Sequence, residues 1–191
     1  MRILILDRDG VINEESDSFI KSPDEWIPIP RSLEAIARAN AAGYRVVVLS
    51  NQSAIARGII DVRTLHLINQ KLIQRLAEVG GRIEAIFFCP HAAVQNCLCR
   101  KPRPGLFTDL AARLHVSLKN APAVGDRLRD LEAARAAGAR PVLVKTGRGE
   151  ATLASGQGLA EIDVYADLAA VVDALPEIEL EAERDGALRP R

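Results

Sequence analysis

Two aspartates stand two positions apart directly after an apolar run near the start of the chain. Asp7 and Asp9 follow residues 3–6, a run typical of a buried β-strand, and Gly10 closes the motif. If the extended backbone continues past the strand, both carboxylates project to the same side. One of them can then attack an electrophile while the other transfers protons. A polar turn that only ends the strand has the same composition, so the motif by itself leaves both interpretations open.

Three further polar segments stand where strand-like runs end or a helix begins. Ser50 directly follows one apolar run, Asp126 follows another, and Lys101 lies in a basic, proline-rich segment before a helical pattern. The carboxyl ends of parallel strands lie along one edge of a sheet. We therefore expect Ser50 and Asp126 to meet the two aspartates of the first motif at that edge. Lys101 must reach the same place from its loop.

This set of side chains suits phosphoryl transfer. A phosphate ester is anionic and repels an attacking carboxylate, so the site needs a cation to neutralise charge. Mg²⁺ is a hard ion held by one or two carboxylates together with waters and substrate phosphate, and Asp7 and Asp126 can supply those carboxylates. The Ser50 hydroxyl can donate a hydrogen bond to a phosphoryl oxygen, and Lys101 can place a positive charge against the transition state. Each residue also has an ordinary structural interpretation, but their order along the chain favours the catalytic one.

The three cysteines lie close together in one short segment. Cys89, Cys97 and Cys99, with His91, form a Cys-x-His and a Cys-x-Cys pair within residues 89–99. An odd number of cysteines in one segment is a poor disulfide framework. Three thiolates and one imidazole complete the tetrahedral ligand set of a structural Zn²⁺ and leave no open position for catalysis. Buried cysteines without a metal, beside a surface histidine, are the alternative.

Strand-like and helix-like segments alternate along the chain and predict the elements that must position these residues. Short aliphatic runs without a period of two are typical of strands covered on both faces, as in a parallel sheet. We expect strands at residues 3–6, 46–49, 85–88, 123–124, 142–144 and 164–165. Apolar residues at helical spacing predict helices over residues 31–42, 61–79, 104–116, 128–137 and 167–175, with Asp61 as an N-cap. The alternation predicts an α/β fold with a doubly wound parallel sheet.

Length and composition predict one soluble domain. The chain has 191 residues, of which 48% are hydrophobic and 26% charged, with 25 basic and 25 acidic side chains. A net charge of zero argues against a nucleic-acid or membrane-surface protein that depends on a global basic field. No apolar run reaches the ~20 residues that span a bilayer, and the amino terminus does not have the pattern of a signal peptide. We expect a cytoplasmic monomer with one domain over residues 1–176 and a weakly ordered tail over residues 177–191.

The ordered motifs resemble those of the haloacid dehalogenase superfamily of aspartyl-phosphate phosphatases. The resemblance includes Asp-x-Asp-Gly, a strand ending in Ser, a Lys before Pro-x-Pro-Gly, and Gly-Asp-x-x-x-Asp. It implies that Asp7 attacks phosphorus to form an aspartyl-phosphate, and that Asp9 protonates the leaving alcohol and then activates the hydrolytic water. It also implies that Mg²⁺ is held by Asp7, the backbone carbonyl of Asp9 and Asp126, with Arg127 and Asp130 nearby. The short spans between the motifs leave no room for an inserted cap domain.

Within this superfamily, the segment at residues 50–58 and the zinc loop are similar to those of heptose-bisphosphate phosphatases. That similarity implies removal of the C7 phosphate from D-glycero-D-manno-heptose 1,7-bisphosphate, in the synthesis of nucleotide-activated heptose for the lipopolysaccharide core. Histidinol-phosphate phosphatases share these motifs and are the alternative, although Arg57 and Arg100 favour a bisphosphate, whose uncleaved phosphate needs cations. A zinc-dependent binding module is a remote alternative. The residues expected to bind the substrate are Glu15, Ser16, Asp17, Ser18, Asn51, Gln52, Ser53, Arg57, Arg100 and Lys101.

Overall fold

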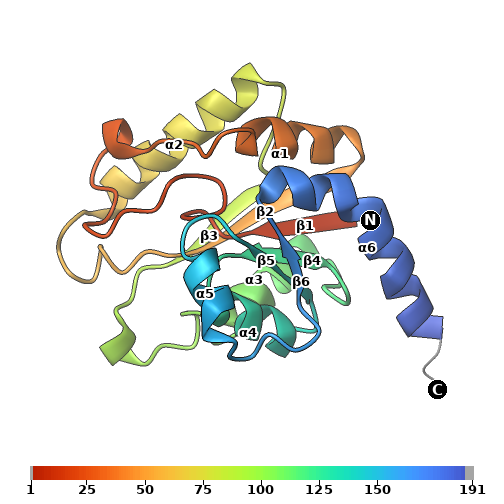
Figure 1. Ribbon diagram of the computed structural model, residues 1–191. Helices are drawn as coiled ribbons and strands as arrows, with labels where there is room; N and C mark the ends of the chain where they lie inside the picture. The colour runs from red at the N-terminus through yellow and green to blue at the C-terminus, as the bar shows by residue number, and fades with distance from the viewer. Residues whose placement is uncertain (1, 188–191) are drawn as a thin grey trace.

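A six-stranded parallel sheet forms the centre of the computed structural model, which describes residues 2–187 (Figure 1). The strand order is β3-β2-β1-β4-β5-β6, and every pair of neighbours runs parallel. The chain therefore starts in the middle of the sheet, winds outward in one direction, and then returns to build the other half. The strands are β1 (Arg2–Leu6), β2 (Tyr44–Asn51), β3 (Ala85–Cys89), β4 (Pro122–Gly125), β5 (Arg140–Val144) and β6 (Asp163–Tyr165).

Helices cover both faces of the sheet, as the crossover connections of a doubly wound fold require (Figure 1). Side chains of three of them join one apolar core, and side chains of two others join a second core on the opposite face. The first group is α1 (Ser32–Ala41), α2 (Val62–Glu78) and α6 (Leu168–Ala187), and the second is α3 (Gly105–Leu114) and α4 (Leu128–Ala136). A short helix α5 (Gly149–Ser155) and two 3-10 turns, Pro23–Glu25 and Ala93–Gln95, complete the described elements.

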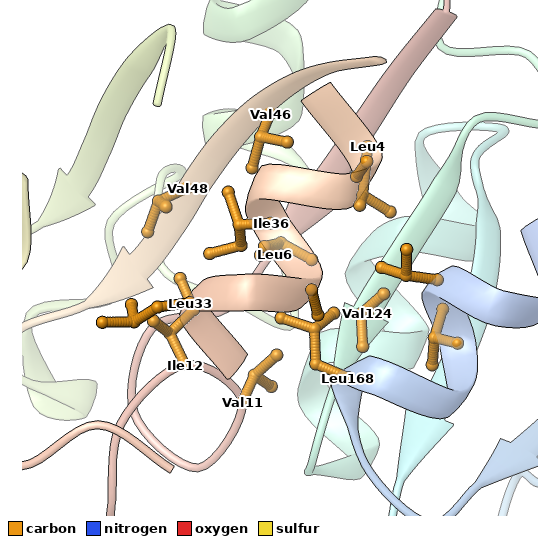
Figure 2. Close-up of a cluster of buried hydrophobic side chains, with 14 of the residues drawn as sticks. Leu4, Leu6, Val11, Ile12, Leu33, Ile36, Val46, Val48, Val124 and Leu168 are labelled. Atoms are coloured by element: carbon orange, nitrogen blue, oxygen red, sulfur yellow. The ribbon is translucent and has the colours of Figure 1, made fainter. Parts of the chain in front are cut away.

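The central strand β1 contributes side chains to both cores. Successive side chains of a strand point to opposite faces. Leu4 and Leu6 pack in the first core, which Figure 2 shows in close-up, whereas Ile3 and Ile5 pack in the second. All four side chains are buried, so the strand reads as a continuous apolar run rather than an alternating one. This burial fixes the strand end from which the acidic motif leaves the sheet.

The expected fold class is confirmed: the chain has a doubly wound parallel sheet with its strands at the predicted positions and no inserted cap in the described residues. Four predicted helices agree with the observed ones to within two residues at each end. Asp61 is the N-cap of α2, because its Oδ1 accepts a hydrogen bond from the backbone nitrogen of Thr64 at 2.7 Å. The seven-residue helix α5 was not predicted, since its segment is too short to show a helical period.

The final predicted helix was placed wrongly at its end. The sequence predicts a helix that stops before Pro176, but α6 continues through this proline to Ala187. Ile178 is buried in the first core, and its carbonyl accepts a hydrogen bond from Arg140 Nη1 at 2.9 Å. These contacts hold the helix beyond the position where the proline removes a backbone donor. Residues 188–191 lie outside the described part of the chain, so the weak order predicted for 177–191 stays a prediction. No helix within the described residues is long and apolar enough to cross a membrane.

Candidate active site

The predicted catalytic side chains converge at the carboxyl edge of the sheet. Asp7 directly follows β1, Ser50 is the second-last residue of β2, and Asp126 directly follows β4. The register places Leu6 beside both Val48 and Val124, so the three strand ends lie side by side. Asp7, Ser50, Asp126 and the nearby Lys101 are all buried. Because these residues are buried, the interactions between the charged ones among them are strong and shift their pKa values.

Lys101 joins two carboxylates at the centre of this edge. Its Nζ lies 3.1 Å from Asp7 Oδ1 and 2.7 Å from Asp130 Oδ1, and it donates a hydrogen bond to the carbonyl of Leu49 at 2.8 Å. Burial by itself would lower the pKa of Lys101, but Asp130 and Asp7 outweigh it and hold the pKa above its usual value. The ammonium group is therefore a permanent cation directly beside Asp7.

The Asn51 side chain fixes the backbone of Lys101. Its Oδ1 accepts a hydrogen bond from the Lys101 nitrogen at 3.2 Å, and its Nδ2 donates to the Lys101 carbonyl at 3.1 Å. This pair ties the end of β2 to the basic loop. The sequence prediction that Lys101 reaches the strand edge is therefore met by the geometry, with Asn51 as the residue that holds it there.

Asp126 has one oxygen with a donor and one without. Its Oδ2 accepts a hydrogen bond from the Arg148 nitrogen at 2.8 Å, whereas its buried Oδ1 has no hydrogen-bond partner among residues 2–187. Burial, followed by repulsion from Asp7 and Asp130, raises the pKa of Asp126 to about 8. The pKa of Asp7 is raised to about 6, again mainly by burial. A divalent cation would supply the missing partner and remove the repulsion, which is the environment that Mg²⁺ requires.

The three carboxylates offer a geometry that fits such a cation. One oxygen each from Asp7, Asp126 and Asp130 lies within 4.8 Å of the other two, and all three residues are buried. Hard oxygen donors of this kind suit Mg²⁺, Ca²⁺ or Mn²⁺. Asp7 and Asp126, the two carboxylates expected to hold Mg²⁺, are thus placed so that they can share one ion, with Asp130 beside them.

Two glycines allow the backbone to close around Asp126. Gly10 and Gly147 both have positive φ, +84° and +58°. A Cβ atom at Gly10 would lie 2.3 Å from Asp126 Oδ2, and one at Gly147 would lie 2.4 Å from the same oxygen. The Thr146 hydroxyl donates to the Gly10 carbonyl at 2.6 Å and joins the two turns. The glycine of the Asp-x-Asp-Gly motif is thus required both for its conformation and for the space that Asp126 fills.

Asp9 is surrounded by hydrogen-bond donors. Oδ1 accepts from Arg8 Nε at 3.0 Å and Asn13 Nδ2 at 2.9 Å, and Oδ2 accepts from Arg8 Nη2 at 3.1 Å and Gln52 Nε2 at 2.9 Å. Burial would raise the pKa of this carboxyl, but Arg8 and the two amides lower it below its usual value. Gln52 Nε2 also lies 2.8 Å from Ser50 Oγ and so connects two of the predicted catalytic residues. Asp9 is therefore held as an anion in a fixed orientation.

A pocket lined by Asp7, Asp9 and Ser50, among others, opens at this strand edge. The loop predicted to bind the substrate, residues 15–18, is held beside this pocket by ion pairs. Glu15 pairs with Arg127, and with Arg148 at 3.1 Å between Nε and Oε2, while Asp17 also pairs with Arg148. Glu15, Ser16 and Asp17 line the pocket, as do all four residues from Ser50 to Ser53 and Arg100. Ser18 lies outside the pocket lining.

Arg57 also lies outside the lining of this pocket. Its guanidinium lies over the Phe19 ring, with 5.8 Å between Cζ and the ring centroid. Three arginines that sequence reasoning did not assign to substrate or loop contacts do line the pocket: Arg8, Arg129 and Arg148. For Arg148 a signal existed, since it stands in a Gly-Arg-Gly segment just after a predicted strand. Nothing in the sequence distinguishes Arg129 from a solvated helical arginine.

The cysteine cluster forms directly beyond β3. The Sγ atoms of Cys89, Cys97 and Cys99 lie 3.3–3.5 Å from one another, and His91 Nδ1 lies 3.6 Å from Cys89 Sγ and 3.4 Å from Cys99 Sγ. Zn–S bonds of about 2.3 Å in a tetrahedron give edges of roughly 3.8 Å, close to these separations. The four residues thus fit a structural Zn²⁺. Within the described residues, no fifth histidine, cysteine or carboxylate joins this group.

Comparison with known proteins identifies the family. The model of the polynucleotide kinase 3 phosphatase family matches residues 2–130, and the HAD-hydrolase-like model matches residues 98–173. The chain is 54% identical over 176 residues to D-glycero-beta-D-manno-heptose-1,7-bisphosphate 7-phosphatase of Bordetella bronchiseptica, covering 92% of this chain and 98% of that protein. It is 51% identical to the enzyme of the same name from Pseudomonas aeruginosa, covering 91% and 97%.

The solved structures agree. The crystal structure of D,D-heptose 1,7-bisphosphate phosphatase from B. bronchiseptica, complexed with magnesium and phosphate, superposes with a TM-score of 0.90 at 52% identity, covering 93% of this chain and 99% of that one. The chain belongs to the heptose-1,7-bisphosphate 7-phosphatase family of the haloacid dehalogenase superfamily. The family resemblance predicted from the motifs is therefore confirmed, and this heptose-bisphosphatase family member is a hydrolase.

Proposed function

We propose that this chain removes the C7 phosphate of D-glycero-β-D-manno-heptose 1,7-bisphosphate through an aspartyl-phosphate on Asp7. The observation that carries this is the joining of Asp7, Lys101 and Asp130 at the strand edge, next to Asp126, whose Oδ1 has no hydrogen-bond partner in the described part of the chain. The relatives from B. bronchiseptica and P. aeruginosa carry the β-anomer in their names, which supports this anomer.

Mg²⁺ would be held by Asp7, Asp126 and the backbone carbonyl of Asp9, with Asp130 beside them. When bound, it neutralises charge on the phosphoryl oxygens and so permits an anionic nucleophile to approach. Lys101 contributes a second positive charge against the same group, and the Ser50 hydroxyl donates a hydrogen bond to it.

The covalent steps fall to the two aspartates. An oxygen of Asp7 attacks phosphorus, the bond from phosphorus to the sugar oxygen breaks, and Asp9 gives its proton to the leaving alcohol. Water then attacks the phosphorus of the aspartyl-phosphate, the bond from phosphorus to the Asp7 oxygen breaks, inorganic phosphate leaves, and Asp9 accepts the water proton. The donors around Asp9 favour its anionic form, which the second step needs. For the first step, an incoming phosphate dianion raises the pKa of Asp9, because a neighbouring negative charge favours the protonated carboxyl.

The substrate is tested by comparing the release of inorganic phosphate from three compounds in the presence of Mg²⁺. These are heptose 1β,7-bisphosphate, its 1α anomer and histidinol phosphate. We expect kcat/KM to be highest for the 1β,7-bisphosphate. Preference for histidinol phosphate would leave the mechanism standing and overturn the substrate. The cytoplasmic location and the monomeric state are also proposals, and sedimentation of the purified protein tests the second.

The nucleophile is tested by Asp7→Asn. This variant keeps the shape of the side chain but removes the attacking anion, so we expect kcat to fall by at least about 10³-fold while the circular dichroism spectrum is retained. Residual activity near the wild-type level would exclude Asp7 as the nucleophile.

A further inference from the structure

Five arginines line the pocket beside the two motif aspartates, and most of them are already engaged. The five are Arg8, Arg100, Arg127, Arg129 and Arg148. The carboxylates of the substrate loop take up two of them, because Glu15 and Asp17 form the ion pairs with Arg127 and Arg148 described above. These two guanidinium groups are committed to holding the loop.

Arg8 and Arg100 also have partners. Arg8 binds the Asp9 carboxylate, and its Nη1 donates to Asn69 Oδ1 at 3.0 Å. Arg100 Nη1 donates to the His91 carbonyl at 3.1 Å, which ties this arginine to the cysteine cluster. The bond from Arg100 is to a neutral acceptor, so its charge is not balanced by a carboxylate.

Arg129 differs from the other four. Its side chain forms no ion pair and no hydrogen bond within residues 2–187, the described part of the chain. Its Nε is buried without a hydrogen-bond partner there. A guanidinium carries five donors, and leaving one buried and unpaired is costly. Arg129 stands in the first turn of α4, three residues after Asp126, so it is built on a rigid element next to the reaction centre.

Positive charge gathers around Arg129 in the pocket. Arg100, Arg127 and Arg129 all line it, and within residues 2–187 only Arg127 of these three has a carboxylate partner. Like charges thus face the same pocket and repel one another. An anion bound between Arg100 and Arg129 would relieve this repulsion and give the buried Nε of Arg129 its acceptor.

We propose that Arg129, together with Arg100, binds the phosphate of the substrate that is not cleaved. The inference rests on the proposed function, which supplies a substrate with a second phosphate. The reacting phosphoryl group already has Lys101 and the bound cation as its counter-charges, so the unpaired arginine is available to the other one. The planar guanidinium can bind a phosphate through two parallel hydrogen bonds.

This assignment places the anchor differently from the sequence prediction. Arg57, expected from sequence to share this role with Arg100, lies over the Phe19 ring and outside the pocket lining. Binding energy from a remote phosphate can be used to position the reacting end, so an anchor of this kind acts on kcat/KM for the bisphosphate alone.

The test compares two substrates that differ only in the remote phosphate. Phosphate release is measured with heptose 1β,7-bisphosphate and with heptose 7-phosphate, for wild type, Arg129→Met, Arg129→Lys and Arg57→Met. Arg113→Met is the matched control, because Arg113 is exposed on α3 outside the pocket lining. Arg129→Met should lower kcat/KM about 10- to 100-fold for the bisphosphate and leave the monophosphate within about twofold. Arg129→Lys should fall between wild type and Arg129→Met, because it keeps the charge but not the two parallel bonds.

Three results would overturn the inference while leaving the proposed function intact. In the first, Arg129→Met lowers kcat/KM equally for both compounds, which would place Arg129 on the reacting phosphate. In the second, Arg57→Met and not Arg129→Met causes the selective loss. In the third, wild type shows no preference for the bisphosphate over the monophosphate. If wild type hydrolyses histidinol phosphate but neither heptose compound, the proposed function itself fails and the inference fails with it.

Discussion

At the scale of single residues, Asp126 carries the largest electrostatic strain of the site. Burial and the neighbouring carboxylates raise its pKa from the ordinary value of 3.8 to about 8. Between these two pH values the folded protein binds more protons than the unfolded chain does. The free energy of unfolding must therefore fall as pH rises between the two pKa values. The contribution of protonated Asp126 to stability is complete only below the lower of them.

This strain predicts an unusual pH dependence of stability. We expect the melting temperature of the metal-free protein to fall between pH 5 and pH 8.5. Added Mg²⁺ should raise it more at pH 8.5 than at pH 6, because the cation binds ionised carboxylates. Asp126→Asn, which does not titrate, should flatten the pH dependence and reduce the effect of Mg²⁺. A melting temperature that rises with pH in wild type, or an equal slope in the variant, would contradict the assignment.

At the scale of elements, the loop over residues 14–22 packs into the first core through Ile20, whereas its part around Glu15 and Asp17 is held by ion pairs. Glu15 is largely buried, but Asp17 is exposed and Arg148 is about half exposed, so each pair contributes at most about 1 kcal/mol to stability. The pairs instead decide where the loop lies relative to the pocket. Loops of this kind lie at the low-stability end of a fold.

Arg148→Met should therefore loosen the loop without unfolding the protein. We expect KM for the bisphosphate to rise several-fold and proteolytic cleavage within residues 14–22 to become faster, with a change in unfolding free energy below about 1 kcal/mol. Arg75→Met is the control, since Arg75 forms its ion pair with Glu78 on the same helix, α2. Unchanged cleavage in Arg148→Met would show that the ion pairs do not hold the loop.

Residues at strand ends could be placed from the sequence, whereas the contacts of residues in loops could not. Asp7, Ser50 and Asp126 could be placed together because the end of a parallel strand fixes the position of the next residue. Lys101 required a resemblance to known motifs, since no local rule sends its loop to the strand edge. The contacts of Arg148 and Arg129 depend on where loops and a helix turn lie in space, and neither periodicity nor turn chemistry encodes that. The helix end at Pro176 was missed because burial of Ile178 outweighs the loss of one backbone donor.

At the scale of the whole molecule, the cysteine cluster lies at the end of the edge strand β3. Cys89 ends β3, which has a neighbouring strand on one side only, and Cys99 lies two residues before Lys101. A metal bound there links the edge of the sheet to the basic loop. Lys101 itself has independent anchors in Asn51, Asp7 and Asp130. Stability and catalysis should therefore respond differently when the metal is lost.

Cys97→Ala tests this separation. We expect elemental analysis to find about one zinc per chain in wild type and none in the variant, because losing one of four ligands should release the metal and free a loop of about ten residues. By comparison with other short cross-links, this costs about 2 kcal/mol or more and lowers the melting temperature by roughly 4–8 °C. Because Asn51 still clamps the Lys101 backbone, kcat below the melting transition should stay within a few-fold of wild type, while KM rises through the loosened Arg100. His66→Ala, an exposed histidine on α2, should alter neither zinc content nor melting temperature. A collapse of kcat in the folded Cys97→Ala protein would mean that the zinc loop, and not Asn51, positions the catalytic lysine.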